Sequence, residues 1–393
     1  MNSSVCIVGG CGHVGLPLGI ALARAGTRAC LYDIDEARVR EVRGGHVGYR
    51  ERGADGALTE ALATGRLEVT ASPGAIGAGD VVVVTIGTPV DEFLDPRVRS
   101  FDLALDDILA NMRAGQLLLL RSTVFPGVTD RLARRMEERG LDVDVAYCPE
   151  RVAQGYALEE LCHFPQIVGG ATARAVRRAG DLFGLLGVAI IELSPIEAEL
   201  AKLFTNAFRY INFAISNQFY LIAQNFGADF HRIYAAVTRD YPRMAGFAPA
   251  GFVGGPCLLK DTMQLGAFNH NTFGIGQAAM TVNEGLPRAM VDAVKGRRDL
   301  RGDTAAILGM AFKGGSDDPR ASLSYKLRKV LTLECRRVIC TDPHIQDPEF
   351  VPLERAIEEA DIVFLGACHE EYRDLVIRKP VVDVFNFLKR AGP

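Results

Sequence analysis

One cysteine of this chain lies among residues that could make it a nucleophile. Cys257 follows the glycine-rich run FVGGP and comes shortly before Lys260 and Asp261. A neighbouring lysine can lower the pKa of a thiol and so raise the fraction of reactive thiolate. For this segment taken alone, a buried structural cysteine is the alternative. The nine cysteines form no CxxC pair, which favours reduced thiols over a disulfide framework or structural zinc, so we expect no metal.

Polar residues recur on one face of a long predicted helix. No proline or glycine occurs from Glu197 to Phe226, and the spacing of apolar residues there is helical. Lys202 and Asn206 are four residues apart, and Glu199 and Arg209 continue the same face. For a single Lys/Asn pair, a solvent-exposed helix face is the alternative interpretation. A central helix between two sheets should have little solvated face, so the stripe is also a candidate lining for an interdomain cleft.

A glycine-rich turn near the N-terminus predicts a dinucleotide site. Val5–Val8 runs into Gly9-Gly10-Cys11-Gly12-His13-Val14-Gly15, a GxGxxG element between a strand and a helix. Such glycines let a pyrophosphate approach the backbone N–H groups at the helix N-terminus. Asp33 ends the next strand, where a carboxylate would bind a ribose 2′-hydroxyl and favour NAD⁺ over NADP⁺. Arg38 could instead serve a phosphate, and a Rossmann-like domain that binds another ligand is the alternative.

Two further strand ends carry polar groups. Thr123 follows the run Leu117–Leu120, and Glu150 follows Val143–Tyr147. Ligands of doubly wound sheets lie beyond the carboxyl ends of the strands, so both side chains are expected near the cofactor crevice. A helix cap is the structural alternative for Thr123, and a surface position is the alternative for Glu150.

The elements that must position these residues predict an α/β fold. Strand and helix patterns alternate at both ends of the chain, so we expect two Rossmann-like doubly wound domains joined by a long central helix and a helical middle domain. The expected domains are residues 1–193, 194–293 and 294–393. The expected strands are Val5–Val8, Ala29–Tyr32, Val81–Ile86, Leu117–Leu120, Val143–Tyr147, Gln166–Val168 and Ala189–Glu192 in the first domain, and Ala305–Met310, Val338–Thr341, Ile362–Leu365 and Val381–Val384 in the last.

The composition excludes several classes of partner. The chain has 393 residues, 48% hydrophobic and 23% charged, which is typical of a globular protein large enough for two or three domains. A formal net charge of -4 gives no basic field for nucleic acid or an anionic membrane. Because no apolar run is long enough to span a membrane and no leader pattern opens the sequence, we expect a cytoplasmic protein.

Seven segments in this order resemble the UDP-glucose/GDP-mannose dehydrogenase family: GCGHVGLPLG, TIGTP, RSTVFPGVTD, the PER after Cys148, EAELAKLFTNAF, FVGGPCLLKD and GMAFKGGSDDPR. The resemblance covers essentially the whole chain. It implies an N-terminal NAD-binding domain, a central helical domain that forms a homodimer through the long helix, and a C-terminal domain that binds the UDP-sugar. It also implies oxidation of the sugar C6 alcohol to a carboxylate with two NAD⁺, through a cysteine thiohemiacetal and thioester.

The resemblance assigns roles by motif position. Cys257 would be the nucleophile, and Lys202 and Asn206 would stabilise oxyanions. Asp261 and Thr123 would hold the hydrolytic water, and Glu150 would assist thioester hydrolysis. The NAD residues implied are Gly10, Gly12, His13, Val14, Gly15, Asp33, Arg38, Thr88, Thr123, Lys260 and Arg320. The substrate residues implied are Glu150, Lys202, Asn206, Lys313, Gly254 through its backbone, and Arg243 reaching the neighbouring subunit.

Departures from the family pattern bear on the substrate. Gln154 stands where UDP-glucose enzymes commonly carry a second glutamate, and Ala321 stands where the family often has an acid. Because it lacks the second acid, the chain is more similar to the branch of the family that acts on UDP-N-acetylhexosamines. We therefore expect UDP-GlcNAc or UDP-ManNAc as the substrate, with UDP-glucose as the alternative. A simple two-electron dehydrogenase without covalent catalysis and a non-catalytic nucleotide-binding relative are the other hypotheses.

Overall fold

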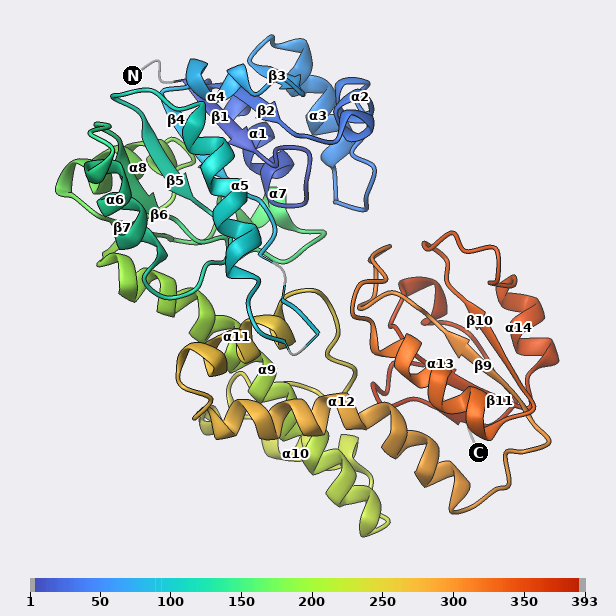
Figure 1. The fold of residues 1–393 in the computed structure, drawn as a ribbon. Coiled ribbons are helices and arrows are strands. Elements are labelled where there is room, and N and C mark those ends of the chain that lie inside the picture. The colour runs from blue at the N-terminus through green and yellow to red at the C-terminus, as the bar shows by residue number, and fades with distance from the viewer. Residues whose placement is uncertain (1–3, 89, 93, 389–393) are drawn as a thin grey trace. The chain divides into compact units, whose positions relative to one another are not determined.

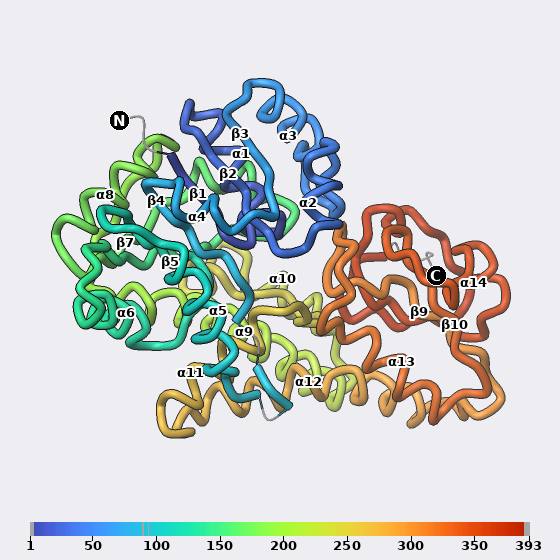
Figure 2. The backbone as a smooth tube through the Cα atoms, turned by 45° about the horizontal axis from the view of Figure 1, so that its top comes forward, coloured from blue at the N-terminus to red at the C-terminus, as the bar shows by residue number. Residues whose placement is uncertain are grey.

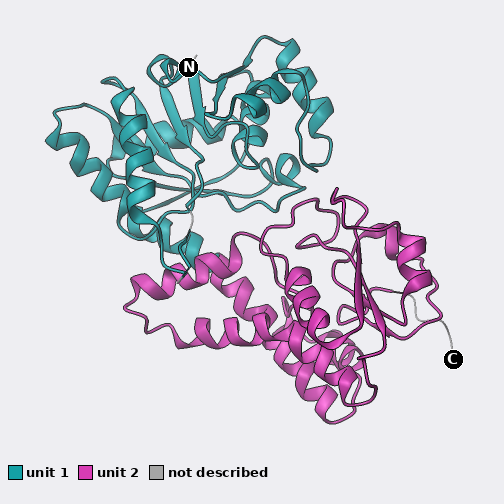
Figure 3. Ribbon diagram, turned by 45° about the vertical axis from the view of Figure 1, so that its right-hand side comes forward, with its two compact units in different colours: residues 1–205 teal, residues 206–393 magenta. Residues whose placement is uncertain are grey.

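The computed structural model describes residues 4–88, 90–92 and 94–388. The chain forms two compact units, Met1–Thr205 and Asn206–Pro393, which Figure 3 shows in different colours. We refer to them as unit 1 and unit 2 and describe each by itself. The long helix α9, Pro195–Asn225, belongs in part to each unit and agrees closely with the long helix expected from the sequence.

Unit 1 is built on an eight-stranded sheet in the order β3-β2-β1-β4-β5-β6-β7-β8. The chain changes direction along the sheet between β1 and β4, and this is the switch point at which doubly wound folds bind ligands. Its strands are β1 Ser4–Val8, β2 Arg28–Tyr32, β3 Leu67–Thr70, β4 Val81–Val84, β5 Leu117–Leu120, β6 Asp144–Tyr147, β7 Gln166–Gly170 and β8 Ile190–Leu193.

Helices cover both faces of this sheet (Figure 1). Successive residues of a strand point to opposite faces, so the runs VVVV of β4 and LLLL of β5 are buried on both sides. One core contains Val83 with residues of α1 and α8, and the other contains Val82 with residues of α5 and α6. The helices are α1 Gly15–Arg24, α2 Glu36–Arg43, α3 Ala54–Ala63, α4 Gly74–Ala78, α5 Val98–Ala110, α6 Val128–Glu138, α7 Ala157–Glu160 and α8 Ala173–Gly184.

Two features of the sheet differ from the sequence expectation. Strand β7 extends the sheet as expected but pairs antiparallel to β6. Between them the chain has only the short helix α7 rather than a crossover helix that would return it to the amino end. Strand β3 was not expected, because LEVT alternates buried and exposed residues and forms no apolar run.

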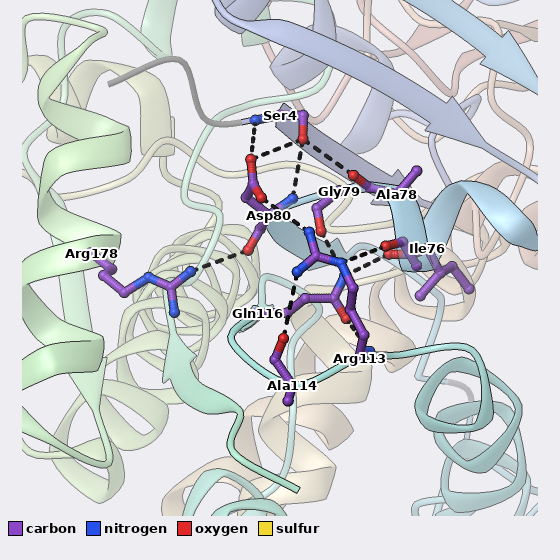
Figure 4. A network of polar contacts seen from close by, with 10 residues as sticks. Ser4, Ile76, Ala78, Gly79, Asp80, Arg113, Ala114, Gln116 and Arg178 are labelled. Atoms are coloured by element: carbon purple, nitrogen blue, oxygen red, sulfur yellow. Dashed lines mark hydrogen bonds and ion pairs between the residues drawn. The ribbon is translucent and has the colours of Figure 1, made fainter.

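A polar network closes the amino end of the sheet, away from the glycine-rich turn (Figure 4). The Asp80 carboxylate accepts hydrogen bonds from the Ser4 backbone N–H at 3.0 Å and from Arg113 at 3.1 Å. The bond from the Ser4 backbone is the largest of the effects that hold the Asp80 pKa below its usual value. Gln116 donates to the carbonyls of Ile76 and Gly79 at 2.7 and 2.6 Å. These polar groups are hydrogen-bond partners of one another, so we assign this end of the sheet a structural role.

Unit 2 combines helices with a four-stranded parallel sheet in the order β10-β9-β11-β12. Helix α12 lies against α13, as Figure 2 also shows, and Leu286 of α12 and Leu327 of α13 share a core with Ile307 of β9. The elements after α9 are α10 Phe230–Thr238, η1 Pro242–Met244, α11 Leu258–Phe268, α12 Gly274–Lys295, β9 Thr304–Leu308, α13 Leu323–Glu334, β10 Arg337–Thr341, α14 Leu353–Glu359, β11 Ile362–Leu365, η2 Glu370–Tyr372 and β12 Val381–Val382.

The expected fold class is confirmed, with two Rossmann-like sheets and a helical middle. Each strand expected from an apolar run lies within one or two residues of a strand in the structure, although β4, β9 and β12 end earlier than expected. Over the residues that the structure describes, no helix has both the length and the apolarity needed to span a membrane.

Candidate active site

The glycines of the turn between β1 and α1 lie where a side chain would not fit. A Cβ atom on Gly10 would lie 2.7 Å from the Ile7 carbonyl oxygen and from the Leu31 Cα. A Cβ atom on Gly15 would lie 2.7 Å from the Gly9 oxygen. The N-cap residue of α1 is Val14, whose side chain cannot cap the helix, and the first turn carries no acid. A helix N-terminus whose first turn carries no acidic side chain suits a pyrophosphate.

Asp33 and Arg38 both lie against this turn. The Asp33 carboxylate accepts hydrogen bonds from the N–H groups of Cys11 and Asp35, each at 3.1 Å. Arg38, on α2, donates to the carbonyls of Cys11 at 3.1 Å and Val47 at 2.7 Å and pairs with Glu41. The carboxylate is therefore held at the end of β2, where a ribose would lie, and the guanidinium braces the turn.

His13 connects the same turn to the loop after β6. Its ring centroid lies 4.0 Å from that of Tyr49, and the Tyr49 hydroxyl donates to the Gly12 carbonyl at 3.3 Å. The Gln154 amide nitrogen lies 3.3 Å from His13 Nδ1. Gln154 therefore contacts the cofactor turn, and Tyr49 is a member of this cluster that the sequence did not indicate.

Three other expected residues of unit 1 follow the carboxyl ends of its strands. Thr88 follows β4 and Thr123 follows β5, and both are half-buried. Glu150 follows β6 and is buried, where it forms an ion pair with the fully buried Arg121. Its other oxygen accepts from the N–H groups of Arg151 at 2.7 Å and Val152 at 2.9 Å. Glu150 is therefore not the surface residue that the structural alternative supposed.

The polar stripe of α9 serves more than one purpose. Glu199 is buried and accepts hydrogen bonds from the Gly127 N–H at 2.6 Å and the Thr129 N–H at 2.8 Å. Burial raises its pKa, although these hydrogen bonds oppose the rise. Glu199 thus caps α6 and does not line a cleft, while Arg209 is exposed. Lys202 is half-buried, one helical turn before Asn206.

Cys257 is the N-cap residue of α11 and is exposed. The uncompensated N–H groups and positive dipole end of a helix stabilise a thiolate. One turn into the helix, the buried Asp261 accepts a hydrogen bond from the Asn206 amide at 2.5 Å. The Lys260 ammonium lies 2.6 Å from the other Asp261 oxygen. Unit 2 therefore brings Asn206, Lys260 and Asp261 together around the first turn after the cysteine.

A buried amide network holds the loop that precedes Cys257. Asn217 of α9 accepts from the Gly251 N–H at 2.8 Å and donates to the Gly251 carbonyl at 3.0 Å. It also donates to Asn283 of α12 at 2.9 Å, and Asn283 donates to the Tyr210 carbonyl at 3.0 Å. Both asparagines are fully buried. The sequence analysis did not single out these two asparagines. The signal that could have found them is an amide side chain among the apolar residues of a helix.

The remaining expected residues of unit 2 lie outside its strands and α-helices. A Cβ atom on Gly254 would lie 2.8 Å from the Ala321 carbonyl oxygen. Lys313 follows β9, with its ammonium 5.7 Å from the Phe312 ring centroid. Arg320 is exposed and forms an ion pair with Asp318 at 2.6 Å. Arg243 is exposed on η1.

The sequence models of the UDP-glucose/GDP-mannose dehydrogenase family match the chain in three parts. These are the NAD binding domain over residues 3–186, the central domain over 196–285 and the UDP binding domain over 306–390. The UDP-N-acetyl-D-mannosamine dehydrogenase of Pyrococcus horikoshii is 30% identical over 380 residues, which cover 93% of this chain and 90% of that protein.

Two solved structures are similar over nearly the whole chain. That of a UDP-D-ManNAc dehydrogenase from Pyrococcus horikoshii has a TM-score of 0.92 at 28% identity and covers 99% of this chain and 97% of its own. That of a UDP-glucose dehydrogenase from Pyrobaculum islandicum has a TM-score of 0.91 at 28% identity, with coverage of 98% and 95%.

The first Rossmann domain matches the family's NAD binding domain and the second, Rossmann-like domain matches its UDP binding domain, so the protein is an NAD-dependent nucleotide-sugar dehydrogenase. The chain belongs to the UDP-glucose/GDP-mannose dehydrogenase family. The expected family, enzyme class and NAD cofactor are thereby confirmed.

Proposed function

We propose that this enzyme oxidises the C6 hydroxyl of a UDP-N-acetylhexosamine to a carboxylate, through a covalent intermediate on Cys257. The observation that carries the proposal is the position of this thiol at the N-terminus of α11, one turn from the Asn206–Asp261 pair. A two-electron alcohol dehydrogenase needs no activated thiol. An exposed cysteine at the positive end of a helix, in a chain of this family, supports the four-electron reaction.

The chain's own residues perform the steps as follows. NAD⁺, held by the glycine-rich turn, would supply the hydride acceptor for each of two oxidations. After the first, the Cys257 sulfur bonds to the aldehyde carbon, and the carbonyl oxygen takes a proton to give a thiohemiacetal. The second oxidation gives a thioester, and water then cleaves the carbon–sulfur bond to release the carboxylate and the thiol. The sum is one alcohol, two NAD⁺ and one water converted to one carboxylate, two NADH and protons.

Positioned donors and a water-binding pair assist these steps. Lys202 and Asn206 stabilise the negative charge that develops on the C6 oxygen, and donors of this kind are worth about 3 kcal/mol each. Asp261 accepts from Asn206 through one oxygen, and the Lys260 ammonium lies 2.6 Å from the other. By motif position, Asp261 and Thr123 are the residues that would orient the hydrolytic water.

In this proposal Glu150 holds the loop after β6 in place. Its ion pair with Arg121 and its two backbone hydrogen bonds occupy both carboxylate oxygens. These contacts favour a role in fixing the loop after β6 for substrate contact over a role as a free base in thioester hydrolysis.

The binding functions divide along the chain. Residues 1–193 bind NAD through Gly10, Gly12, His13, Val14, Gly15, Asp33, Arg38, Thr88 and Thr123, with Lys260 and Arg320 contributing from later in the chain. Residues 194–293 form the central substrate and dimerisation domain. Residues 294–393 bind the nucleotide, with Lys313 in the loop that follows the carboxyl end of β9, the end of the strand at which such sheets bind ligands.

The substrate assignment rests on relatives and on Gln154. The similar sequence and the similar structure from Pyrococcus horikoshii both carry the name of a UDP-ManNAc dehydrogenase. The neutral amide of Gln154, at 3.3 Å from His13, supports a contact with the cofactor turn in place of an acidic residue. UDP-glucose remains the rival substrate, because a similar structure carries that name.

A homodimer through α9 is part of the proposal. Phe208, Phe219 and Phe226 have exposed fractions of 66%, 47% and 84%. Together with Ile215 and Ile222 their spacing places them on one face of the helix. An apolar stripe of this kind suits burial against the same helix of a second copy. Arg243 is exposed on η1, which is compatible with reaching a partner's site.

Sedimentation tests the dimer. Phe208→Glu should produce monomers, whereas Leu333→Glu, which changes an exposed apolar side chain on α13, should leave the dimer intact. A monomeric wild-type protein at micromolar concentration contradicts this part of the proposal.

NADH production with a panel of donors tests the reaction. UDP-GlcNAc, UDP-ManNAc, UDP-GalNAc, UDP-glucose and GDP-mannose are each incubated with the enzyme and NAD⁺, and the product mass and the NADH yield per sugar are measured. We expect two NADH and a uronate from a UDP-N-acetylhexosamine, and no uronate from Cys257→Ser. One NADH per sugar, or a serine variant with normal turnover, would refute covalent catalysis.

A further inference from the structure

Two buried side chains of unit 2 connect the carboxyl ends of three strands, β9, β10 and β11. Asp342 follows β10 and His369 lies in the loop after β11, and both side chains are fully buried. The His369 Nε2 lies 3.1 Å from the Asp342 Oδ2. The imidazole also packs against two other rings, with centroid distances of 4.8 Å to His344 and 5.6 Å to Tyr372. Its orientation is therefore fixed by packing as well as by hydrogen bonding.

Asp342 holds the start of the loop that carries Lys313. This loop, residues 309–320, follows the carboxyl end of β9. The Asp342 Oδ2 accepts hydrogen bonds from the N–H groups of Met310 at 2.6 Å and Ala311 at 3.0 Å. The other carboxylate oxygen accepts from two N–H groups of its own loop, at 2.8 and 3.0 Å. The carboxylate thus ties the loop after β9 to the loop after β10, shortly before Lys313.

His369 holds the same loop on the other side of Lys313. The Gly315 N–H donates to the His369 Nδ1 at 3.2 Å. Because Nδ1 accepts this bond, the ring proton lies on Nε2, which donates to Asp342. Both ring nitrogens are used in this way, and Asp342, His369 and Gly315 form one chain of hydrogen bonds.

Two further contacts restrict the loop around Lys313. A Cβ atom on Gly314 would overlap the Cys368 carbonyl oxygen, so the loop backbone lies directly against the segment after β11. The Phe312 N–H donates to the Asp318 carbonyl at 3.0 Å, which closes the loop on itself. The backbone is therefore held immediately before and immediately after Lys313.

We infer that Asp342 and His369 are positioning residues for the nucleotide, because they fix the backbone around Lys313 and so set where its ammonium meets the diphosphate. Both side chains are fully buried, so they act through the loop and not by contact with the ligand. A loop that is already held in its binding conformation loses less conformational entropy when the ligand binds, and the affinity is higher as a result. This inference rests on the proposed function, in which Lys313 binds the nucleotide.

Binding of UDP to the whole enzyme, measured by calorimetry, tests the inference without turnover. His369→Phe keeps an aromatic ring in place but removes both hydrogen bonds. We expect the Kd of UDP to rise at least about ten-fold, the scale of one lost buried hydrogen bond, and the Kd of NAD⁺ to change less than about two-fold. In steady-state kinetics the KM for the nucleotide sugar should rise likewise while kcat changes less than about two-fold, because Cys257 and its neighbours are not part of this loop.

His369→Gln is the conservative variant. Its amide offers a donor for Asp342 and an acceptor for Gly315, as the neutral imidazole does, so it should recover most of the UDP affinity. Asp342→Asn should also weaken UDP binding, because it replaces one acceptor oxygen by a donor. In the double variant with His369→Phe, the loss should be smaller than the product of the two single losses, because the two side chains act as one unit.

The matched control is Asp361→Asn, at the opposite end of the same sheet. The Asp361 carboxylate also accepts a backbone hydrogen bond, from the Thr304 N–H at the start of β9, at 2.8 Å. The control removes one negative charge from unit 2, as Asp342→Asn does, but makes no change at the Lys313 loop. We expect it to leave the UDP affinity unchanged.

Three results would overturn the inference. The first is an unchanged UDP affinity in His369→Phe, and the second is an equal loss in the phenylalanine and glutamine variants, which would show that the hydrogen bonds are not what matters. The third is equal weakening of UDP and NAD⁺ binding, which would indicate general damage to the fold. If the phenylalanine variant does not fold, His369→Asn replaces it, because its shorter side chain cannot reach both partners.

Failure of the proposed function is seen separately. A Cys257→Ser variant that still forms the uronate would refute covalent catalysis without affecting UDP binding. A wild-type enzyme that does not bind UDP would contradict the nucleotide role of Lys313, and the inference with it.

Discussion

Removal of the Asn217 side chain should separate the support of the cysteine loop from general stability. Asn217→Ala deletes three hydrogen bonds, two to Gly251 and one to Asn283, and leaves their buried partner atoms without a replacement. Each lost bond costs about 1 kcal/mol net, and unsatisfied buried atoms cost more, so we expect a loss of about 3–5 kcal/mol in the free energy of unfolding. Because the loop leads to Cys257, kcat should fall at least about ten-fold.

The control for this substitution lies on the same helix. Asn212 also bonds to the loop, donating to the Gly246 carbonyl at 2.5 Å and accepting from the Ala248 N–H at 3.3 Å, but it is only half-buried, so water can replace its side chain. Asn212→Ala should cost about 1 kcal/mol or less. Urea unfolding followed by circular dichroism gives the stabilities, and steady-state kinetics give kcat and the KM for NAD⁺. Equal losses in the two variants, or a changed KM for NAD⁺ with normal kcat in Asn217→Ala, would refute the reasoning.

Three further predictions follow from single contacts. Gly10→Ala places a methyl group 2.7 Å from the Ile7 carbonyl oxygen, so the turn must distort and the KM for NAD⁺ should rise at least about ten-fold, measured by initial rates. Burial opposes ionisation of Asp342, but hydrogen bonds from His369 and backbone N–H groups outweigh it and hold its pKa far below the usual value. Its contribution to stability is therefore fully present above the unfolded pKa of about 4 and is lost as pH falls through the folded pKa, so Asp342→Asn should cost about 2 kcal/mol or more at pH 7 and about 1 kcal/mol less at about pH 3 in thermal melts. Burial raises the pKa of Cys148 to about 12, so iodoacetamide at pH 8 should label Cys257 and leave Cys148 unlabelled until guanidinium unfolds the protein.

The sequence determined the parts of the molecule that follow from local pattern. Apolar runs bounded by turns marked most of the strands, and a run without proline or glycine marked α9 almost to its ends. The glycine turn and the loop before Cys257 could be predicted because glycine at fixed spacing usually marks a close approach of the backbone. Asp33 could be predicted from its position at the end of the second strand. Strand β3 was not predicted, because the residues of this short edge strand alternate between buried and exposed and form no apolar run.

Only the tertiary structure decided which polar residues meet. Glu199 and Lys202 share a helix face in the sequence, yet Glu199 caps α6, because a carboxylate reaches free N–H groups only when the two helices are packed together. The pairing of Lys260 with Asp261 and of Arg320 with Asp318 likewise assigns the charges near Cys257 in a way that neighbouring positions in the sequence could not. Hydrogen bonds and ion pairs act over about 3 Å, whereas spacing along the chain fixes only the face on which a side chain lies, so the partner of each charge is set by the fold.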